Sequence, residues 1–425
     1  MTAKNSKSKQ PSEPGSADSG RYDVAIVGGG LVGASLACAL APLGLRVALI
    51  EAVAFRAASQ PSYDDRTLAM SATSCRILDG LGLWDGLASS ATPIREIQVR
   101  ELGRPGRVVM RPEELGREWF GNVVEARAFG ATVMERLPQL DGLDFHCPAS
   151  VTRVQADDGG ALVEFSGDDG DRRIEASLLV GADGAQSFVR KALGIAVRRH
   201  DYGQTAVICN VTPERDHRGT AYECFTPTGP FAVMPHVDGR CGLIWCVRTG
   251  EAPGLLEMGE AEFLERANAR FGGHLGRFVK IGRRSSYPLR LVRALQDTAP
   301  RAVILGNAAH AIHPVGAQGF NLGLRDVAVL AEVIADEVRG AGTFDAGASA
   351  LLSRYSRWRE ADHRGTIAYS DGLARMFSNP SPLAAAARGV GMMAHALLPP
   401  LRRRMAVQAM GYRGHIPRLA VGEPL

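Results

Sequence analysis

The stretch YDVAIVGGGLVG, residues 22–33, decides the fold. Its apolar first half is typical of a buried strand, and glycines at positions 28, 30 and 33 then lead into an apolar helix. In this GxGxxG pattern the first glycine permits a tight turn, the second lets backbone N–H groups approach a pyrophosphate, and the third lets the helix pack closely on the sheet. The helix N-terminus then faces the anionic phosphates. The pattern predicts the start of a Rossmann-like α/β domain that binds a dinucleotide.

A second apolar strand follows the helix and ends at Glu51. A strand, a helix and a strand in this order form a right-handed crossover and a parallel sheet. An acidic residue about twenty positions after the glycines accepts hydrogen bonds from an adenosine ribose and disfavours a 2′-phosphate. The first motif therefore predicts bound NAD or FAD, and by itself it does not choose between them.

Length and composition exclude several classes of protein. A chain of 425 residues exceeds the size of one hydrophobic core, which indicates two domains or one domain with a large insertion. A net charge of +4 gives no electrostatic basis for binding nucleic acid. The seven cysteines are odd in number and widely spaced, which argues against a disulfide framework.

Two later segments carry further cofactor signals. GADG at 181–184 follows an apolar strand, where Asp183 either supports a bound cofactor or simply caps the next helix. GNAAHAIHPVGAQGFNLG at 306–323 reads as a strand end, a polar residue, a glycine-rich loop and a helix start. The positive end of that helix would stabilise the negative charge of a reduced flavin, and Asn307 is placed to bind a ribityl hydroxyl. This segment favours FAD over NAD.

The periodicity along the chain predicts how the domains are arranged. We expect a Rossmann-like FAD-binding domain, an inserted antiparallel-sheet substrate domain and C-terminal helices. Within the first domain the pattern predicts helices over 68–81 and 123–137. The expected order is a disordered tail (1–20), FAD-binding segments (21–92, 122–197 and 298–375), a hairpin and a sheet of the substrate domain (93–121 and 198–297) and a helical region (376–425).

Together these motifs resemble the FAD-dependent aromatic hydroxylases of the para-hydroxybenzoate hydroxylase fold. The resemblance rests on the GxGxxG start, RTLAMS at 66–71, GADG and GNAAHAIHPVGAQGFNLGLRD at 306–326. FTPTGPFAVMP at 225–235 and DGRCGLIWC at 238–246 are most similar to the ubiquinone-biosynthesis branch, closest to its 2-polyprenyl-6-methoxyphenol hydroxylases. The resemblance covers residues 21–412.

The resemblance implies a reaction and a set of partners. NAD(P)H reduces FAD, O₂ forms a flavin C4a-hydroperoxide, and its distal oxygen attacks the electron-rich ring of a polyprenyl phenol. The flavin carries the difficult step while the protein orients the ring and excludes water. The implied cofactor contacts are Gly28, Gly30, Leu31, Val32 and Gly33 at the pyrophosphate, Glu51 at the ribose, Arg66 and Arg127 at the phosphate or ribityl region, Asp183, Asn307 at the ribityl chain, and Pro314, Gly316, Ala317, Gln318, Gly319, Phe320 and Asn321 around the isoalloxazine.

Two positions depart from the pattern common in this family. Asn307 stands where an aspartate is usual, which keeps a hydrogen bond but removes a charge. The loop reads Gly316-Ala317 where the usual order is Ala-Gly. Because a Cβ disfavours a positive φ, we expect Ala317 to oppose the usual loop path.

The substrate side is less defined by the sequence. Met234, Pro235 and Trp245 are candidates to line the pocket from the second domain, and the core of the sheet is an equal alternative for them. His310 and His313 either stabilise their loop or face the substrate. As a metal-binding pair they lack a third ligand, so we expect no metal. No residue stands out as a base that would ionise a phenol.

Other functions remain as alternatives. The same chemistry on a small soluble phenol and a non-catalytic FAD-holding scaffold both fit the motifs, whereas a nicotinamide dehydrogenase is disfavoured by the third motif. Flavin-dependent halogenation is disfavoured because no lysine lies between Lys9 and Lys191.

Localisation is predicted from two segments. The uncharged run 24–45 is long enough for a membrane span, but its glycines and Pro42 argue against one. An apolar and then basic stretch over 381–404 is either a packed helix pair or a surface that meets lipid or other ubiquinone-biosynthesis proteins. We expect a cytoplasmic protein at the periphery of the inner membrane.

Overall fold

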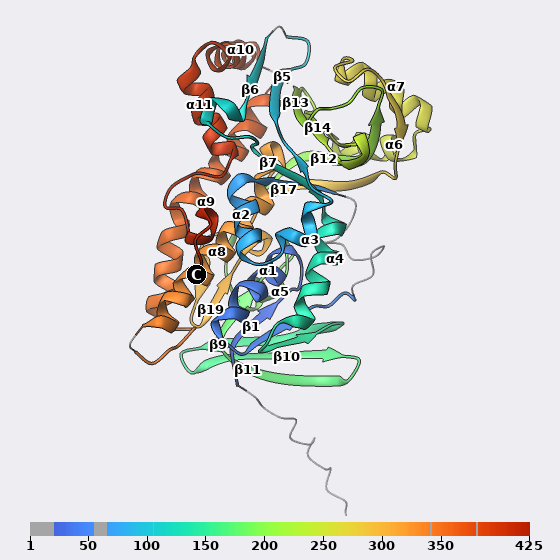
Figure 1. The fold of residues 1–425 in the computed structure, drawn as a ribbon. Coiled ribbons are helices and arrows are strands. Elements are labelled where there is room, and N and C mark those ends of the chain that lie inside the picture. Colours follow the sequence, from blue (N-terminus) through green and yellow to red (C-terminus); the bar gives the residue numbers. More distant parts are fainter. Residues whose placement is uncertain (1–20, 55–65, 105, 341, 380) are drawn as a thin grey trace, which may run out of the picture.

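The computed structural model describes residues 21–54, 66–104, 106–340, 342–379 and 381–425. The predicted disordered tail lies outside these ranges. Figure 1 shows two large sheets, one in each half of the molecule, with helices α8–α11 along one side of both. This α/β architecture agrees with the predicted fold class.

The first sheet is built around β1, which contains the start of the glycine motif. The strands in spatial order are β18 (Thr298–Ala299), β19 (Ala302–Ile304), β11 (Gly170–Gly181), β1 (Arg21–Val27), β2 (Val47–Ile50) and β8 (Leu143–His146), and β9 (Ala149–Asp157) and β10 (Gly160–Gly167) extend it beyond β11. β1 is parallel to both of its neighbours. Its residues Val24 to Ile26 are fully buried, as expected of a strand covered on both faces.

Two helices that begin at the predicted glycine-rich turns pack against this sheet. α1 (Leu31–Leu40) follows the first motif and α8 (Gln318–Arg339) follows the third. α1 and α8 contact each other, and apolar side chains of both belong to one buried cluster. The sheet therefore brings motifs almost three hundred positions apart to the same edge.

The second sheet holds the segments predicted for the substrate domain. Its order is β20 (His310–Ala311), β17 (Ser285–Ala294), β12 (Val197–Pro213), β15 (Cys241–Arg248), β14 (Gly229–Pro235), β13 (Thr220–Thr226), β5 (Glu96–Glu101) and β6 (Arg107–Met110), and β16 (Phe278–Ile281) pairs with β12. The β5–β6 hairpin joins through a parallel pairing of β5 with β13. One face of this sheet is covered by α6 (Ala252–Glu257) and α7 (Glu260–Phe271).

A small third sheet includes the first residues of two predicted helices. β3 (Thr67–Ser71) pairs with β7 (Gly121–Glu125), which also pairs with β4 (Thr92–Pro93). The helices α2 (Ala72–Gly80) and α4 (Ala126–Arg136) begin only after these strands. The predicted helices over 68–81 and 123–137 therefore begin too early. In each case a short apolar strand is followed directly by a helix, and the sequence shows one continuous apolar run with no boundary between strand and helix periodicity.

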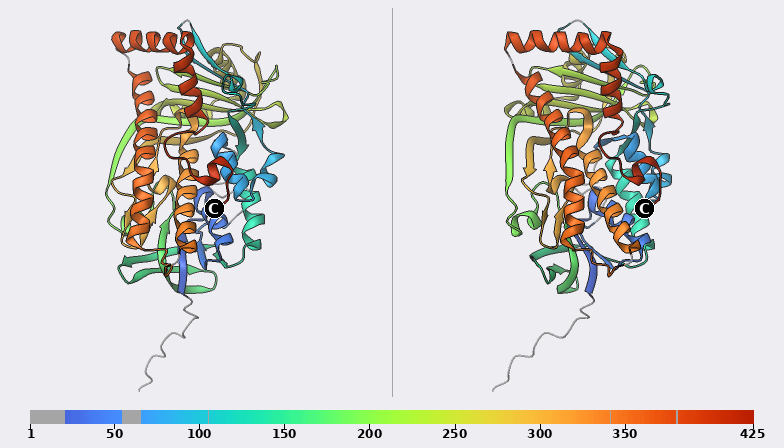
Figure 2. Two further views of the ribbon diagram at one scale, coloured as in Figure 1. Left: turned by 60° about the vertical axis from the view of Figure 1, so that its left-hand side comes forward. Right: turned by 90° about the vertical axis from the view of Figure 1, so that its left-hand side faces the viewer.

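The C-terminal region is helical, as predicted. α9 (Ser349–Ser378) runs along both sheets, and α10 (Pro382–Leu397) lies across its end before α11 (Pro399–Ala409) turns back, as Figure 2 shows. The short helix α12 (Arg418–Val421) packs on α2. Across the described ranges, no helix combines the length and the apolar character that crossing a membrane requires.

Candidate functional site: a cavity between the two sheets

One large cavity connects the glycine motifs to the C-terminal helices. Its volume is about 1160 Å³, and it is lined by the carboxyl ends of β1 and β2, by one face of the second sheet and by α9, α10 and α11. Among the expected cofactor residues, those that line it are Gly28, Gly30, Leu31, Val32, Glu51, Arg66, Asp183, Asn307, Pro314, Gly316, Ala317, Gln318, Gly319, Phe320 and Asn321. Gly33 and Arg127 are not among the lining residues.

The first motif needs its glycines for space. Gly28 has φ +103°, and a Cβ there would lie 2.6 Å from the main-chain oxygen of Ala182. A Cβ on Gly33 would lie 1.9 Å from the oxygen of Gly28, so this glycine sets how closely α1 approaches β1. Gly30 is the N-cap of α1 and offers no side chain to its first-turn N–H groups. Those donors face the cavity, where an anion satisfies them.

Glu51 is held in place by the loop it faces. Its Oε2 accepts a hydrogen bond from the Gly29 N–H at 2.7 Å, and its Oε1 accepts one from the Val53 N–H at 2.9 Å. Glu51 as a whole residue is 9% exposed and borders the cavity. This position at the end of β2 is the one that a ribose-binding acid requires.

Asp183 caps the next helix and also borders the cavity. Its Oδ2 accepts hydrogen bonds from the N–H groups of Phe188 and Val189 at 2.6 and 3.0 Å, which caps α5 (Phe188–Ala192). Its Oδ1 is buried and has no hydrogen-bond partner within the described residues. Since a buried acceptor without a partner is costly, this atom fits a site that a hydroxyl-bearing cofactor completes.

The third motif adopts a backbone that the sequence argument did not expect. Ala317 has φ +51° and ψ +37°, and Gly316 also has a positive φ. The Cβ of Ala317 therefore does not keep the loop out of a left-handed conformation, as the sequence argument had expected. The turn is held because the Ala317 N–H donates to the Pro314 oxygen at 2.8 Å and the Asn321 Nδ2 donates to the Ala317 oxygen at 2.7 Å.

The polar residues of this motif divide into two groups. The Asn321 Oδ1 accepts hydrogen bonds from the Ser71 N–H and the Ser74 hydroxyl, so its side chain ties α8 to α2. The Gln318 Nε2 donates to the Gly316 oxygen and holds the loop. Asn307, by contrast, is exposed to the cavity. Asn307 is therefore the residue of this motif whose amide is placed to contact a cofactor.

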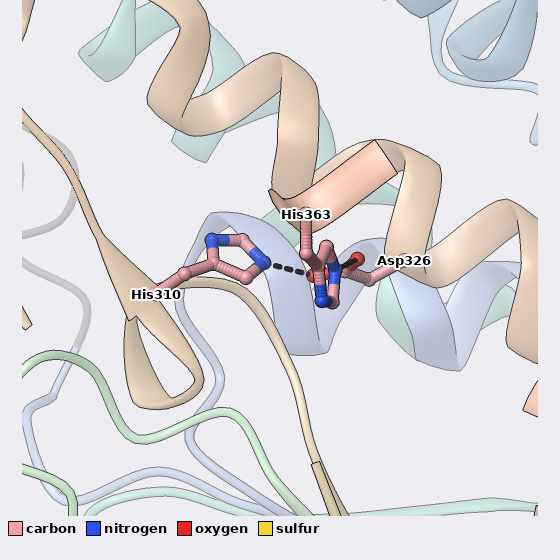
Figure 3. Close-up of side chains that lie close together, drawn as sticks. All are labelled: His310, Asp326 and His363. Atoms are coloured by element: carbon pink, nitrogen blue, oxygen red, sulfur yellow. Dashed lines mark hydrogen bonds and ion pairs between the residues drawn. The ribbon is translucent and has the colours of Figure 1, made fainter. Parts of the chain in front are cut away.

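His310 lies in a buried ion cluster behind the cavity. Its Nε2 is 2.6 Å from Asp326 Oδ2, and His363 Nε2 is 2.6 Å from Asp326 Oδ1, as Figure 3 shows. Arg359 also donates to Asp326, whose Oδ2 accepts the Gly306 N–H at 3.0 Å. Burial raises the pKa of Asp326, but the charges of His310, His363 and Arg359 lower it well below its usual range. The three are potential metal ligands whose donor atoms lie within 4.8 Å of one another. Here both histidines contact Asp326, and the cluster fixes the start of the third motif.

His313 also holds the loop rather than facing the cavity. Its Nε2 is 3.1 Å from Gln204 Oε1, and its Nδ1 accepts the Val315 N–H at 3.2 Å. Burial lowers the pKa of His313 to about 4. The ring is therefore neutral at neutral pH, consistent with its acceptor position.

Successive side chains of a strand point to opposite faces of the sheet, and this alternation decides which substrate-side candidates reach the cavity. Met234 lines it, whereas Pro235 is the next residue on β14 and points to the opposite face. Trp245 lies on that opposite face too, packed against Phe231 and Phe263 under α6 and α7. Trp245 and Pro235 thus belong to the sheet core, and for them the substrate-lining interpretation was wrong, as it was for His310 and His313.

Several lining residues were missed by the sequence analysis. Glu223 on β13 and Tyr369 on α9 are two polar residues among them, and α10 and α11 contribute Met392, His395, Met405 and Gln408. Residues 222–226 fall within the predicted sheet of the substrate domain. Both faces of this segment carry apolar residues, so alternation does not show which face points inward. The first of these helices begins 59 positions beyond the last motif, which ends at residue 323, and no local pattern joins the helices to it.

The cavity fits FAD at its sheet end. Four polar groups border this end of the cavity. They are the N-terminus of α1, the carboxylate of Glu51, the Oδ1 of Asp183, which has no hydrogen-bond partner among the described residues, and the amide of Asn307. The N-terminus of α8 also has no side-chain cap and borders the same space. Its positive end would stabilise negative charge on a flavin bound there.

Comparison with known proteins shows the family of the chain. The FAD binding domain family matches residues 21–368. Ubiquinone hydroxylase UbiL of Rhodospirillum rubrum is 41% identical over 407 residues, which cover 95% of this chain and 93% of that protein. The 3-demethoxyubiquinol 3-hydroxylase of Escherichia coli is 34% identical over 394 residues, covering 92% and 98%.

Solved structures agree on the fold. The p-nitrophenol 4-monooxygenase PnpA of Pseudomonas putida has a TM-score of 0.76 and 20% identity, and the match covers 92% of this chain and 99% of that one. The chain belongs to the family of FAD-binding aromatic hydroxylases that contains the ubiquinone hydroxylases. The family predicted from the motifs is thereby confirmed.

Proposed function

We propose that the protein is a monooxygenase that hydroxylates the aromatic ring of a polyprenylated phenol in ubiquinone biosynthesis, with O₂ as co-substrate and NAD(P)H as electron donor. The observation that carries the proposal is the single cavity that joins the FAD motifs to an apolar end at α9–α11. Bound FAD supplies the electron transfer and the activation of O₂. The names of the Rhodospirillum and Escherichia relatives support a ubiquinone precursor as substrate.

The residues of the chain have defined tasks in this reaction. The N-termini of α1 and α8 bind the negative parts of the cofactor, and Glu51 and Asn307 orient it. Apolar side chains of the second sheet and of α9 hold the ring and exclude water, so that activated oxygen reaches the ring. They are Ile97, Val99, Val108, Met110, Phe225, Ala232, Met234, Ile244, Leu373, Met376 and Phe377.

The apolar lining favours a prenylated substrate over a small soluble phenol. A lone ring needs only the part of the cavity next to the flavin, whereas the lining continues to Met392 on α10 and Met405 on α11. Burying an isoprenoid chain there contributes about 25 cal/mol per Å² of apolar surface. The length of the apolar lining therefore supports a long tail.

The exposed face of α10 supports a membrane surface as the source of such a substrate. Leu383, Val390, Met393 and Leu397 are 63–83% exposed. The charged residue of this helix, Arg388, is buried and bonded to Glu101. α11 follows with exposed Arg403 and Arg404. An apolar face beside basic residues fits an anionic bilayer, and the other face of α10 borders the cavity.

The test is turnover with isotopic oxygen. The FAD-loaded protein is mixed with NADH or NADPH, a prenylated phenol and ¹⁸O₂, and mass spectrometry is expected to show one ¹⁸O atom on the ring. In a strain lacking the protein, a prenyl phenol short of one hydroxyl is expected to accumulate. Hydroxylation of small phenols with no turnover of prenylated ones would contradict the proposal.

A further inference from the structure

Glu223 occupies an unusual position in the cavity wall. It lies on β13 between Ala221 and Phe225, and all three line the cavity, as alternation along a strand requires. Its cross-strand neighbours are Ala232 on β14 and Val99 on β5, which line it too. A single carboxylate thus stands on an otherwise apolar part of the sheet.

The described part of the chain offers this carboxylate no hydrogen bond and no ion pair. The surface that Glu223 keeps exposed opens onto the cavity rather than onto bulk water. Burial raises the pKa of Glu223 to about 7, and no charged neighbour contributes to this shift. The other described carboxylates that line the cavity, Glu51 and Asp183, are held by backbone N–H groups at its flavin end.

The titratable groups around Glu223 come from three elements. Cys224 is on its own strand, Cys246 lies on β15, and Tyr369 projects from α9 on the far wall. Burial raises the pKa of Tyr369, and the charge of Glu223 raises it further. All three neighbours are neutral near pH 7, so Glu223 is the group among them that changes charge there.

We propose that Glu223 is the catalytic base that accepts the proton of the substrate's phenol hydroxyl. In this step the phenol O–H bond breaks, its electron pair stays on the phenol oxygen, and the proton forms an O–H bond on the Glu223 carboxylate. No oxidation or reduction occurs, and the phenolate ring becomes more electron-rich toward an electrophilic oxygen. The inference rests on the proposed function because it requires a phenol as substrate.

The raised basicity suits this task. An ordinary carboxylate is a much weaker base than a phenolate, because the phenol has a pKa of about 10. A pKa of about 7 narrows that gap while leaving a large ionised fraction at neutral pH. A buried acid without a partner destabilises a fold, so its presence on a cavity wall indicates a functional position.

The test uses a fluorinated probe, 4-fluoro-2-geranylphenol, bound to the FAD-loaded protein without NAD(P)H. The ¹⁹F resonance of the bound probe is expected to shift with pH around 7 in the wild type and to lose this dependence in Glu223→Gln. With NAD(P)H, the variant is expected to hydroxylate about 100-fold more slowly, as loss of a general base predicts. Glu223→Asp is expected to be intermediate, and the exposed Glu257→Gln is the matched control.

The outcomes separate the two proposals. A wild-type protein that binds and hydroxylates no prenylated phenol would overturn the proposed function, and the base assignment with it. A Glu223→Gln protein that keeps its FAD, its ¹⁹F titration and its rate would overturn the base assignment alone. Retained FAD and an unchanged unfolding midpoint in the variant show that any loss is chemical rather than structural.

Discussion

The guanidinium of Arg190 donates a hydrogen bond to the main-chain oxygen of Ala308, with 2.7 Å between nitrogen and oxygen. Its second nitrogen donates to the oxygen of Ala185 at 2.9 Å. Arg190 is 1% exposed. One buried side chain therefore joins the second cofactor motif to the third across more than a hundred positions.

Replacing Arg190 by methionine is expected to lower the free energy of unfolding by about 2–4 kcal/mol, because the buried carbonyl of Ala308 loses its donor and the part-buried hydrogen bond to Ala185 is lost as well. Arg190→Lys keeps the charge but not the two-point geometry, so its loss should be intermediate. Urea unfolding of the FAD-free proteins measures the free energy of unfolding of both variants. The exposed neighbour Lys191→Met is the control, and an Arg190→Met protein as stable as this control would disprove the bridge.

The order of small residues in the third motif gives a second prediction. Ala317 is strained in its left-handed conformation, which glycine adopts without strain. A glycine would also raise the entropy of the unfolded chain, and this effect opposes the gain in stability. Ala317→Gly is expected to stabilise the protein by up to about 1 kcal/mol. Gly316→Ala should destabilise it by about 1 kcal/mol, and since no atom lies within 4 Å of the added Cβ, this loss reports the backbone alone. Equal stability of the two variants would contradict this account.

His313 predicts a pH dependence of stability. Its folded pKa of about 4 lies below the ordinary value of 6.5. Above 6.5 the ring is neutral in both states, and as the pH falls toward 4 the unfolded chain takes up a proton that the folded protein does not. Stability is therefore lost in this window, by up to about 3 kcal/mol.

The measurement compares urea unfolding of the wild type and of His313→Gln across that window. The variant should lose less stability than the wild type as the pH falls, because the titrating group is gone. The exposed His415→Gln serves as the control and should follow the wild type. Parallel pH curves for all three proteins would show that His313 is not the cause.

The sequence predicted the features that depend on local backbone geometry. Gly28 and Gly33 are required by contacts of 2.6 and 1.9 Å that any Cβ would make, so their spacing alone identified the turn. The site residues that were misplaced depend on contacts between distant segments. His310 is explained by Asp326 and His363, and Glu223 is distinguished only once β5, β14 and α9 surround it.

Strand parity explains the remaining errors on the substrate side. Met234 and Pro235 are adjacent on one strand and must face opposite ways, but the sequence does not say which face meets the cavity. The covering helices α6 and α7 decide it, because they bury the face that carries Trp245. The sequence showed that α10 is rich in apolar residues. Which of them are exposed and which are packed became clear only from the positions of β6 and α11, which contact one side of the helix.

The last prediction concerns that face of α10. Replacing Leu383, Val390 and Leu397 together by glutamate is expected to weaken binding to vesicles that contain phosphatidylglycerol by at least tenfold, because each buried apolar side chain of this size contributes about 1.5–3 kcal/mol. Sedimentation with vesicles measures the bound fraction. Leu295→Glu is the matched control, since Leu295 is also an exposed leucine, at 58%, but lies outside the C-terminal helices. Arg403→Glu with Arg404→Glu should weaken binding mainly at low salt, as a surface attraction is screened by ions. Undiminished vesicle binding by the triple variant, with its FAD retained, would show that α10 does not meet the bilayer.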